Sequence, residues 1–527
     1  MTALSKVIRK FLLLSTLLLV LLNVSSAEGI GGKWKAKLTG RDGTRVVFFN
    51  FNHEGDSLTG TVDAPWGTSE IKNGKVNGSG FSFEIVEKGQ TITFNGKVED
   101  QTLRITLSGI PQKMEFLLTR DSEDSTVSST AADNYAPGST SMTNEKIKFP
   151  KIDRHPAPAD YQRSKLSALP SYDAGSERGF QVDLRSYDLT GLDLSKSLND
   201  LMYADFDSRT KWPQGEKIAQ GFDYKSILEI NKNPGLGIRG LHKEGITGKG
   251  ISIAIIDQPL IIEHQEYNGR IKFYEEVNMS PDIESQMHGP AVASIAVGKT
   301  TGVAPKADLY YMATFGGTFN RETNEFTRDY SFLAKAVRRI LEINRQLPEQ
   351  EKIRVISMSI GWGPNENGAG ELQAAVSEAK SQGIFVVSSN LEQTYGFRFH
   401  GLGRSPISDP DDFSSYEPGL FWRKMYFRSQ GNFPGRLLVP MDSRTTASPN
   451  GVDEYTFYRE GGWSWSIPYI ASVYALAAQV SPSVTPEKFW KAAMETGRTI
   501  RFSQDGKEYS LEKIIDPSAL IKALRSN

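Results

Sequence analysis

The 527-residue sequence predicts an α/β domain with a doubly wound, mostly parallel sheet, preceded by a small all-β barrel. Two observations support this architecture. Residues 31–120 contain short alternating strands separated by Gly and Asx turns, at the spacing typical of an antiparallel barrel. From residue 178 on, buried apolar runs alternate with stretches of helical periodicity, which is typical of a parallel sheet covered by helices.

The first 27 residues predict a secretory signal peptide. Lys6, Arg9 and Lys10 precede an apolar run over residues 11–22, and the segment ends on the small residue Ala27. Because the run is shorter than the ~20 residues that cross a bilayer, we favour a cleaved signal over an uncleaved membrane anchor. We therefore expect a secreted, extracellular protein that has no membrane span once the signal is removed.

Composition excludes several classes of function. The chain has no cysteine, which excludes disulfide scaffolds, zinc ribbons, iron–sulfur clusters and thiol catalysis. Its 61 basic and 62 acidic residues give no broad positive field, so we expect no nucleic-acid partner. Without the three basic residues of the signal the balance is 58 against 62, or −4. A secreted chain without cysteine is typical of a bacterial exoenzyme, so we expect a bacterial origin.

Residues 28–120 predict the β-barrel, which resembles the lipocalins at its two ends. Trp34 lies in the first strand and Arg120 at the end of the last, and in lipocalins such a Trp packs under such an Arg. The alternative is an aromatic ring that closes one end of any small barrel. About 90 residues leave little room for a ligand, so a carrier role is not favoured. The expected strands are 33–39, 45–52, 57–63, 80–86, 91–97, 102–108 and 113–119, with another near 68–72.

Two regions follow the barrel. Residues 121–177 are rich in Ser, Thr, Asp and Ala at their start, which predicts a flexible interdomain linker with order resuming by Phe180. Residues 178–527 predict the α/β domain, in which sites gather at the carboxyl ends of the strands. Its clearest elements are strands 251–256, 355–360 and 384–387 and helices 331–347 and 371–382.

Three polar residues lie at the end of a predicted strand or at the start of a predicted helix. Asp257 ends an apolar strand, His288 begins an apolar helix 31 residues later, and Ser464 follows two glycines at the start of a long helix 176 residues further on. Each alone is more often a turn former or a helix cap. Together they have the chain order Asp, His, Ser, which is one of the orders of the serine-protease triad.

The chain from about residue 235 to 523 resembles the subtilisin-like serine proteases, or subtilases. GKGISIAIID resembles their Asp block, HGPAVAS their His block and GGWSWSIPYIA their Ser block. The resemblance implies a subtilisin-like fold and a serine endopeptidase without a cofactor. It also implies that Ser359, Ile360 and Gly361 bind extended peptide, that Asn390 supplies an oxyanion donor, and that His264 is structural. Subtilases commonly have a propeptide, for which residues 121–240 are the candidate region.

The expected chemistry follows from the residue types. His288 takes the proton of the Ser464 hydroxyl and later gives it to the leaving amine. Asp257 accepts a hydrogen bond from the other ring nitrogen and orients the imidazole. Ser464 at a helix start adds its backbone N–H and the positive end of the helix dipole for the oxyanion. Protein or peptide is therefore the expected substrate.

Four positions depart from the family pattern and leave alternatives open. Gln258 and Pro259 follow Asp257, Pro290 follows the His-Gly pair, tryptophans flank Ser464, and Ser389 stands where a Gly usually precedes the Asn. These departures motivate a second hypothesis, a catalytically silent pseudoprotease that binds peptides. A third treats the barrel as a ligand-binding module with the α/β domain as processing machinery. Trp362, Trp463 and Trp465 either shape the substrate pocket or pack in the core.

Residues 391–460 match nothing recognisable. His400 lies there with Asp409, Asp411 and Asp412, which suggests either a metal site or a solvated loop. We favour the loop, because the acidic residues lack the even spacing of a calcium-binding loop. Calcium thus stays an alternative without a motif, and the oligomeric state is not predicted.

Overall fold

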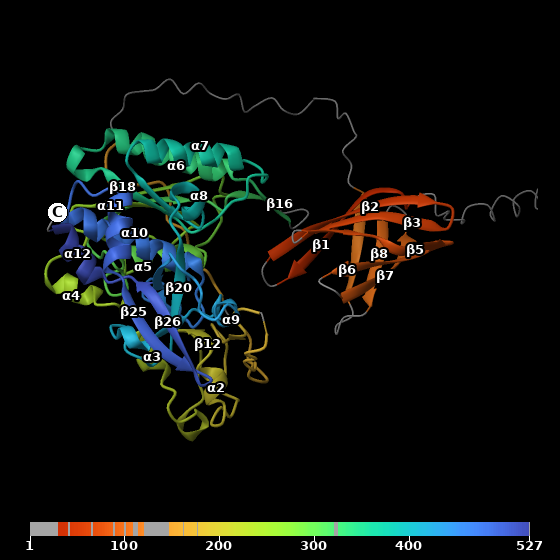
Figure 1. Ribbon diagram of the computed structural model, residues 1–527, viewed down its shortest axis with the longest axis horizontal. Helices are drawn as coiled ribbons and strands as arrows, with labels where there is room; N and C mark the ends of the chain where they lie inside the picture. Colours follow the sequence, from red (N-terminus) through yellow and green to blue (C-terminus); the bar gives the residue numbers. More distant parts are fainter. Residues whose placement is uncertain are drawn as a thin grey trace, which may run out of the picture. The chain divides into compact units, whose positions relative to one another are not determined.

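The computed structural model describes residues 30–40, 43–64, 67–87, 90–99, 102–108, 114–120, 147–161, 163–176, 178–320 and 325–525. The chain divides into two compact units, one within residues 1–143 and one within residues 144–527. The first unit is drawn in red to orange and the second in yellow to blue (Figure 1). The predicted signal peptide, residues 1–27, lies outside the described residues. No described helix is both long and apolar enough to span a membrane.

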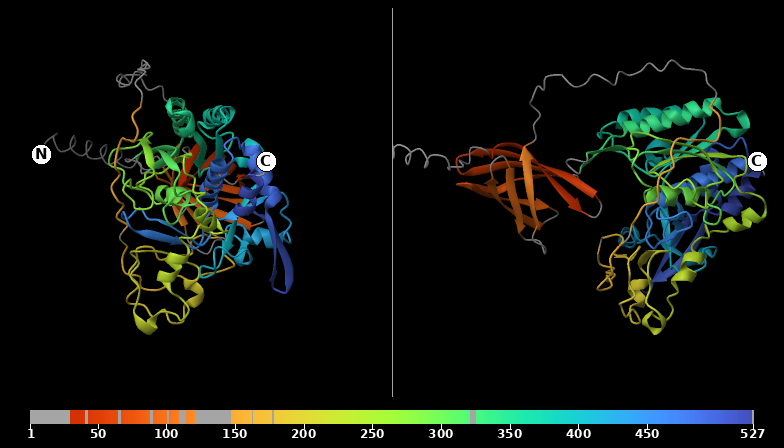
Figure 2. Two further views of the ribbon diagram at one scale, coloured as in Figure 1. Left: turned by 90° about the vertical axis from the view of Figure 1, so that its left-hand side faces the viewer. Right: turned by 180° about the vertical axis from the view of Figure 1, so that it is seen from behind.

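The first unit is a closed antiparallel barrel, as predicted. Eight strands pair in the cyclic order β1, β2, β3, β5, β6, β7, β8, β9, and the pairing of β9 with β1 closes the ring, while β4 pairs on the side of β3. The stretch expected as one strand near 68–72 forms two, β4 and β5. The strands are β1 (Gly32–Gly40), β2 (Gly43–Glu54), β3 (Ser57–Ala64), β4 (Gly67–Glu70), β5 (Lys72–Asn77), β6 (Gly80–Glu87), β7 (Gln90–Glu99), β8 (Thr102–Ser108) and β9 (Met114–Arg120) (Figure 2).

Aromatic rings fill the barrel interior. Phe83 stacks on Phe94 with ring centroids 4.6 Å apart, and further phenylalanines pack around this pair. The guanidinium group of Arg120 lies 4.7 Å from the ring of buried Trp34, and Arg120 also donates to the carbonyl oxygen of Gly31 at 3.2 Å. The Trp–Arg contact expected from the lipocalin resemblance is therefore present, and side chains occupy the centre of the barrel.

The second unit is built on a six-stranded parallel sheet in the order β10-β14-β15-β13-β18-β19. Side chains alternate between its faces along each strand, so Ile253 and Ile255 of β13 pack under α5 and α10, while Ala254 and Ile256 pack under α6 and α7. Helices on both faces of a parallel sheet confirm the doubly wound fold (Figure 1). The elements are β10 (Lys151–Ile152), β13 (Ser252–Asp257), β14 (Ile271–Glu276), β15 (Asp308–Ala313), β18 (Ile353–Met358), β19 (Phe385–Ser388), α5 (His288–Val297), α6 (Ser331–Gln346), α7 (Ala369–Ser381) and α10 (Trp463–Val480).

Smaller sheets surround this centre. One has the order β21-β20-β22-β26-β25, a second β11-β12-β24-β23, and β16 and β17 form a hairpin. Residues 182–228 have little regular structure and pack around Phe206 and Trp212. The remaining strands are β11 (Val182–Asp183), β12 (Ala204–Asp207), β16 (Gly317–Asn320), β17 (Glu325–Arg328), β20 (Phe399–Arg404), β21 (Tyr416–Pro418), β22 (Leu437–Pro440), β23 (Arg444–Ala447), β24 (Tyr455–Tyr458), β25 (Arg498–Gln504) and β26 (Lys507–Ile514). The remaining helices are α2 (Leu198–Leu201), α3 (Tyr224–Ile230), α4 (Ile238–Lys243), α8 (Leu391–Tyr395), α9 (Arg423–Arg428), α11 (Pro486–Thr496) and α12 (Pro517–Arg525).

The boundary between linker and α/β unit lies earlier than residue 178. Residues 121–146 of the predicted linker lie outside the described residues, but from Ile147 on the chain contacts the second unit. β10 extends the parallel sheet by pairing with β14, and Arg154 binds Glu276 at 2.6 and 2.8 Å. The Ala159 N–H donates to the carbonyl oxygen of Pro449. Polar and edge-strand contacts, which a composition argument does not detect, order this segment.

Candidate active site

Asp257 and His288 meet at the carboxyl end of the parallel sheet. Asp257 is the last residue of β13 and His288 the first of α5, and Asp257 Oδ1 lies 2.7 Å from His288 Nδ1. A Cβ atom at Gly289 would lie 2.1 Å from the carbonyl oxygen of Gln258. Only glycine therefore lets the start of α5 approach the end of β13 closely enough for this contact.

The surroundings of His288 favour its protonated form. Burial alone lowers the pKa of His288, but the negative charge of Asp257 and the hydrogen bond to it together outweigh burial, and the pKa is raised above its ordinary value. The Asp257 side chain is 6% exposed, so little solvent screens this interaction. The pair is thus suited to accept and hold a proton.

Ser464 is the second residue of α10, where backbone N–H groups have no partner within the helix. Its carbonyl oxygen accepts a hydrogen bond from the Ser359 hydroxyl at 3.0 Å, which holds the start of α10 beside the end of β18. The Trp465 ring lies 5.2 Å from the His288 ring and 5.2 Å from the Tyr458 ring. Among the described residues, the Ser464 hydroxyl makes no hydrogen bond to His288. Catalytic hydrogen bonds often form only in the complex with substrate, so the lack of this bond is compatible with a triad.

The three predicted substrate-binding residues follow directly on β18. The Ser389 N–H donates to the carbonyl oxygen of Ile360 at 3.1 Å, and the Tyr330 hydroxyl donates to that of Gly361 at 3.0 Å. Each of these carbonyls therefore has one protein partner and one lone pair left for a peptide.

The Asn390 side chain is turned toward the same segment. Its Oδ1 accepts from the Trp362 N–H at 3.1 Å and its Nδ2 donates to the Trp362 carbonyl oxygen at 2.8 Å. A Cβ atom at Gly361 would lie 2.8 Å from Asn390 Oδ1, so the amide lies directly against the predicted peptide-binding strand. Nδ2 has one hydrogen left, and the oxyanion role of Asn390 stays a prediction.

Two buried carboxyl groups support the loop that leads to Ser464, and the sequence analysis missed both. Asp442 accepts from the Gly461 N–H at 2.8 Å and from the Leu420 N–H at 2.7 Å. Asp205 accepts from the Arg459 N–H at 2.7 Å. Burial raises the pKa of Asp442 to about 7 and that of Asp205 to about 8. No motif marks these residues, because their partners are distant in sequence.

Trp463, one of the two tryptophans that flank Ser464, packs with His400. The Trp463 indole Nε1 lies 3.3 Å from His400 Nδ1, and His400 stacks on Trp422 with centroids 4.3 Å apart. Burial, with the charge of Arg436, lowers the pKa of His400 to about 4, so the ring is neutral near pH 7 and can accept this hydrogen bond. Trp362 and Trp465 are buried in the core, and Trp465 also contacts the His288 ring. His400 is thus a packing residue.

The other residues considered for a metal have structural roles. Asp412 caps the short helical turn at residues 413–415, and Asp411 accepts from Asn233 and from the Gly237 N–H. His264 is buried, with its Nε2 2.9 Å from the carbonyl oxygen of Glu454, as expected for a structural histidine. Within the described residues, no group of three or more His, Asp or Glu side chains could hold a metal ion.

Comparison with known proteins supports the family expectation. Residues 248–416 match the model of the subtilase family. The subtilase match includes Asp257 and His288 and ends before Ser464. Alkaline protease 1 of Aspergillus flavus is 23% identical over 256 residues, which are 47% of this chain and 57% of that protein. Subtilisin-like protease 1 of Arthroderma gypseum is 28% identical over 245 residues, 44% of each chain. Subtilisin E of Bacillus subtilis is 25% identical over 259 residues, 46% of this chain and 60% of that protein.

The chain thus spans about half the length of the curated relatives it matches. Among solved structures, a prenylagaramide maturation protease has a TM-score of 0.38 at 17% identity and covers 55% of this chain and 99% of its own. A protease from Pseudoalteromonas arctica has the same score and identity and covers 57% of this chain and 98% of its own.

Proposed function

We propose that the second unit is a serine endopeptidase that hydrolyses peptide bonds through Asp257, His288 and Ser464. The observation that supports this most strongly is the 2.7 Å contact between Asp257 and His288 at the carboxyl end of the sheet. The Ser359–Ser464 hydrogen bond brings the start of α10 to the same edge. The match of residues 248–416 to the subtilase family is an independent support.

The first half of the reaction forms an acyl-enzyme. The Ser464 hydroxyl oxygen attacks the carbonyl carbon of the scissile bond while His288 takes the hydroxyl proton at Nε2. Asp257 stabilises the imidazolium that results, which agrees with the raised pKa of His288. His288 then gives this proton to the nitrogen of the breaking C–N bond, and the leaving peptide departs as an amine. A water molecule then attacks the ester carbon while His288 takes its proton. His288 returns this proton to the Ser464 oxygen as the ester C–O bond breaks, which frees Ser464.

Negative charge develops on the carbonyl oxygen in both halves. The backbone N–H of Ser464 at the start of α10 is one donor, and the remaining Nδ2 hydrogen of Asn390 is the second. The segment Ser359–Gly361 holds the acyl half of the substrate by backbone hydrogen bonds, which any extended peptide can make. Protein and peptide are therefore the proposed substrates, and residues 1–27 support secretion as the route to them.

The experiment compares the wild type with Ser464→Ala, using a fluorophosphonate probe and casein as substrate. We expect the wild type to be labelled and to cleave casein, and the variant to do neither. Ser466→Ala is the matched control, because Ser466 lies in the same helix. Its hydroxyl is buried and donates to the Pro440 carbonyl oxygen at 3.5 Å. A folded wild type that is not labelled would contradict the proposal and favour the peptide-binding alternative.

A further inference from the structure

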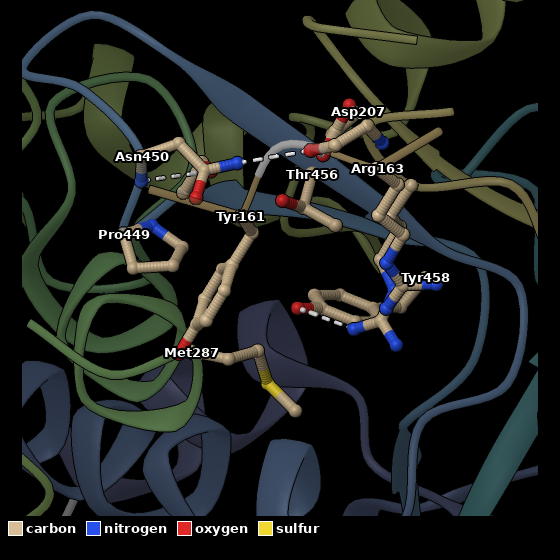
Figure 3. A pocket seen from close by; sticks show the side chains of 11 residues that line it. Tyr161, Arg163, Asp207, Met287, Pro449, Asn450, Thr456 and Tyr458 are labelled. Atoms are coloured by element: carbon tan, nitrogen blue, oxygen red, sulfur yellow. Dashed lines mark hydrogen bonds between the residues drawn. The ribbon is translucent and has the colours of Figure 1, made fainter. Parts of the chain in front are cut away.

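A cavity of about 200 Å³ lies next to His288 on the second unit. The residues that line it include Tyr161, Arg163, Arg185, Asp207, Met287 and Tyr458. Figure 3 shows Tyr161, Pro449 and Met287 on one side of this cavity and Tyr458 and Arg163 on the other.

The cavity lies close to His288. Met287 directly precedes His288, and Tyr458 packs on Trp465, which packs on the His288 ring. The acyl half extends along residues 359–361, which contribute nothing to the lining. Because His288 protonates the leaving nitrogen in the proposed reaction, we place the chain beyond that nitrogen beside His288 and within reach of the cavity.

Two guanidinium groups line the cavity and share one carboxylate. Arg185 binds Asp183 through two nitrogens, at 2.8 and 3.0 Å, and Arg163 binds it at 2.9 Å. Burial raises the pKa of Asp183, but the hydrogen bonds and charges of Arg185 and Arg163 outweigh burial and leave its pKa below the ordinary value. Asp183 is thus ionised and already bound on both oxygens, while the Arg163 side chain stays 34% exposed with N–H groups to spare.

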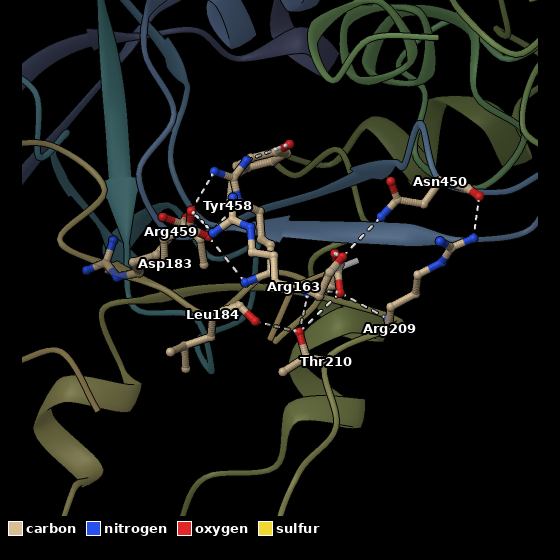
Figure 4. A network of polar contacts seen from close by, with 12 residues as sticks. Arg163, Asp183, Leu184, Arg209, Thr210, Asn450, Tyr458 and Arg459 are labelled. Atoms are coloured by element: carbon tan, nitrogen blue, oxygen red, sulfur yellow. Dashed lines mark hydrogen bonds and ion pairs between the residues drawn. The ribbon is translucent and has the colours of Figure 1, made fainter. Parts of the chain in front are cut away.

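The other carboxyl groups near the cavity are either hydrogen-bonded within the protein or mostly neutral. Asp207 accepts hydrogen bonds from the N–H and hydroxyl of Ser186 and from the Thr210 hydroxyl. Arg209, whose backbone N–H donates to Asp207 at 3.0 Å, is paired through its side chain with Glu454 at 2.7 Å. Burial raises the pKa of Asp205 to about 8, so this carboxyl is mostly neutral near pH 7. Figure 4 shows this network of arginines and acids.

We propose that this cavity binds a carboxylate of the leaving peptide, with Arg163 and Arg185 as donors and Tyr161, Met287 and Tyr458 as apolar walls. The inference depends on the proposed peptidase function and names its substrate preference. The carboxylate is supplied either by a Glu or Asp side chain shortly after the scissile bond or by the free C-terminus of a short leaving peptide. Arginine pairs suit a carboxylate because their N–H groups match its two oxygens.

The test uses internally quenched peptides with one constant acyl half. Glu, Gln or Lys is placed at each of the first three leaving-side positions in turn, and a second set compares a free C-terminal carboxylate with an amide. At one position we expect kcat/KM to be roughly tenfold or more higher for Glu than for Gln, and lowest for Lys. An effect confined to the C-terminal set would assign the carboxylate to the chain end.

Variants decide whether Arg163 causes the preference. In Arg163→Gln the Glu-to-Gln ratio should fall toward one, and in Arg163→Glu the order should invert in favour of Lys. Arg398→Gln, an exposed arginine paired with Glu392 outside the cavity, should keep the wild-type ratio. Equal rates for Glu, Gln and Lys, or a ratio unchanged in Arg163→Gln, would overturn the inference. Fluorophosphonate labelling of Ser464 in the same samples reports separately on the proposed function.

Discussion

The Ser359 hydroxyl donates to the Ser464 carbonyl oxygen at 3.0 Å, and the sequence of α10 explains why that oxygen is available. In an α-helix this carbonyl would accept from the N–H four residues later, but that residue is Pro468, which has no N–H. The proline thus frees the Ser464 carbonyl, and Ser359 at the end of β18 satisfies it. This contact joins the proposed peptide-binding segment directly to the proposed nucleophile.

Replacing Ser359 should therefore impair the reaction at Ser464. In Ser359→Ala the Ser464 carbonyl loses its donor, and a lost hydrogen bond of about 1 kcal/mol corresponds to roughly fivefold in rate. The second-order rate of fluorophosphonate labelling measures this effect without a peptide substrate. Ser359→Thr keeps the hydroxyl and should label at nearly the wild-type rate. An unchanged rate in Ser359→Ala would mean that the contact does not position Ser464.

The Asp257–His288 pair predicts an acid limb in the pH profile. Activity requires neutral His288, and its raised pKa means that kcat/KM falls, on acidification, at a pH above the ordinary value for histidine near 6.5. Asp257→Asn removes the charge that raises this pKa. We expect the limb to move to lower pH and kcat to fall by roughly 10³- to 10⁴-fold. A profile of kcat/KM from pH 4 to 9 measures both effects, and a limb at the same pH in both proteins would contradict the assignment.

Asp205 and Asp442 should make the second unit less stable as pH rises. Their folded pKa values, about 8 and about 7, lie above the usual value of about 4 for an unfolded aspartate. Between pH 4 and pH 8 the folded state therefore holds more protons than the unfolded state, so the free energy of unfolding declines over this range and levels off above it. Each carboxyl group accounts for a decrease on the order of a few kcal/mol in the free energy of unfolding over this pH range.

Thermal unfolding of the Ser464→Ala protein from pH 4 to 9 measures this slope without autolysis. Asp442→Asn and Asp205→Asn remove the titrating groups and should flatten the decline of Tm with pH. In Asp442→Asn the new amide keeps only one acceptor for the two N–H groups of Leu420 and Gly461, so some loss of Tm at pH 4 is also expected. A Tm that rises from pH 4 to 8 in the parent protein would contradict the assigned protonation.

The sequence predicts those parts of the fold and site that local patterns mark. Apolar runs predict β13, β18 and α5, and Asp257 and His288 stand out because they lie at the end of β13 and the start of α5. Ser464 lies beyond the family match, and its proposed role depends on its glycine pair and the long apolar helix that it begins. Asp205, Asp442 and the Arg163–Asp183 contact depend on partners 19 to 254 residues away, and no periodicity encodes such pairs.

Asn390 is proposed to donate to the oxyanion, while its side-chain oxygen and nitrogen both bind Trp362. If its second Nδ2 hydrogen reaches the oxyanion, Asn390→Ala should lower kcat by roughly 10²- to 10³-fold with little change in KM, since the bond forms only in the transition state. If the side chain only supports Trp362 and the peptide-binding segment, KM should rise while kcat changes little. Asn390→Asp separates the roles further, because it keeps an acceptor for the Trp362 N–H and loses the N–H donor. Loss of kcat in both variants, with Tm near that of the wild type, is the expected outcome.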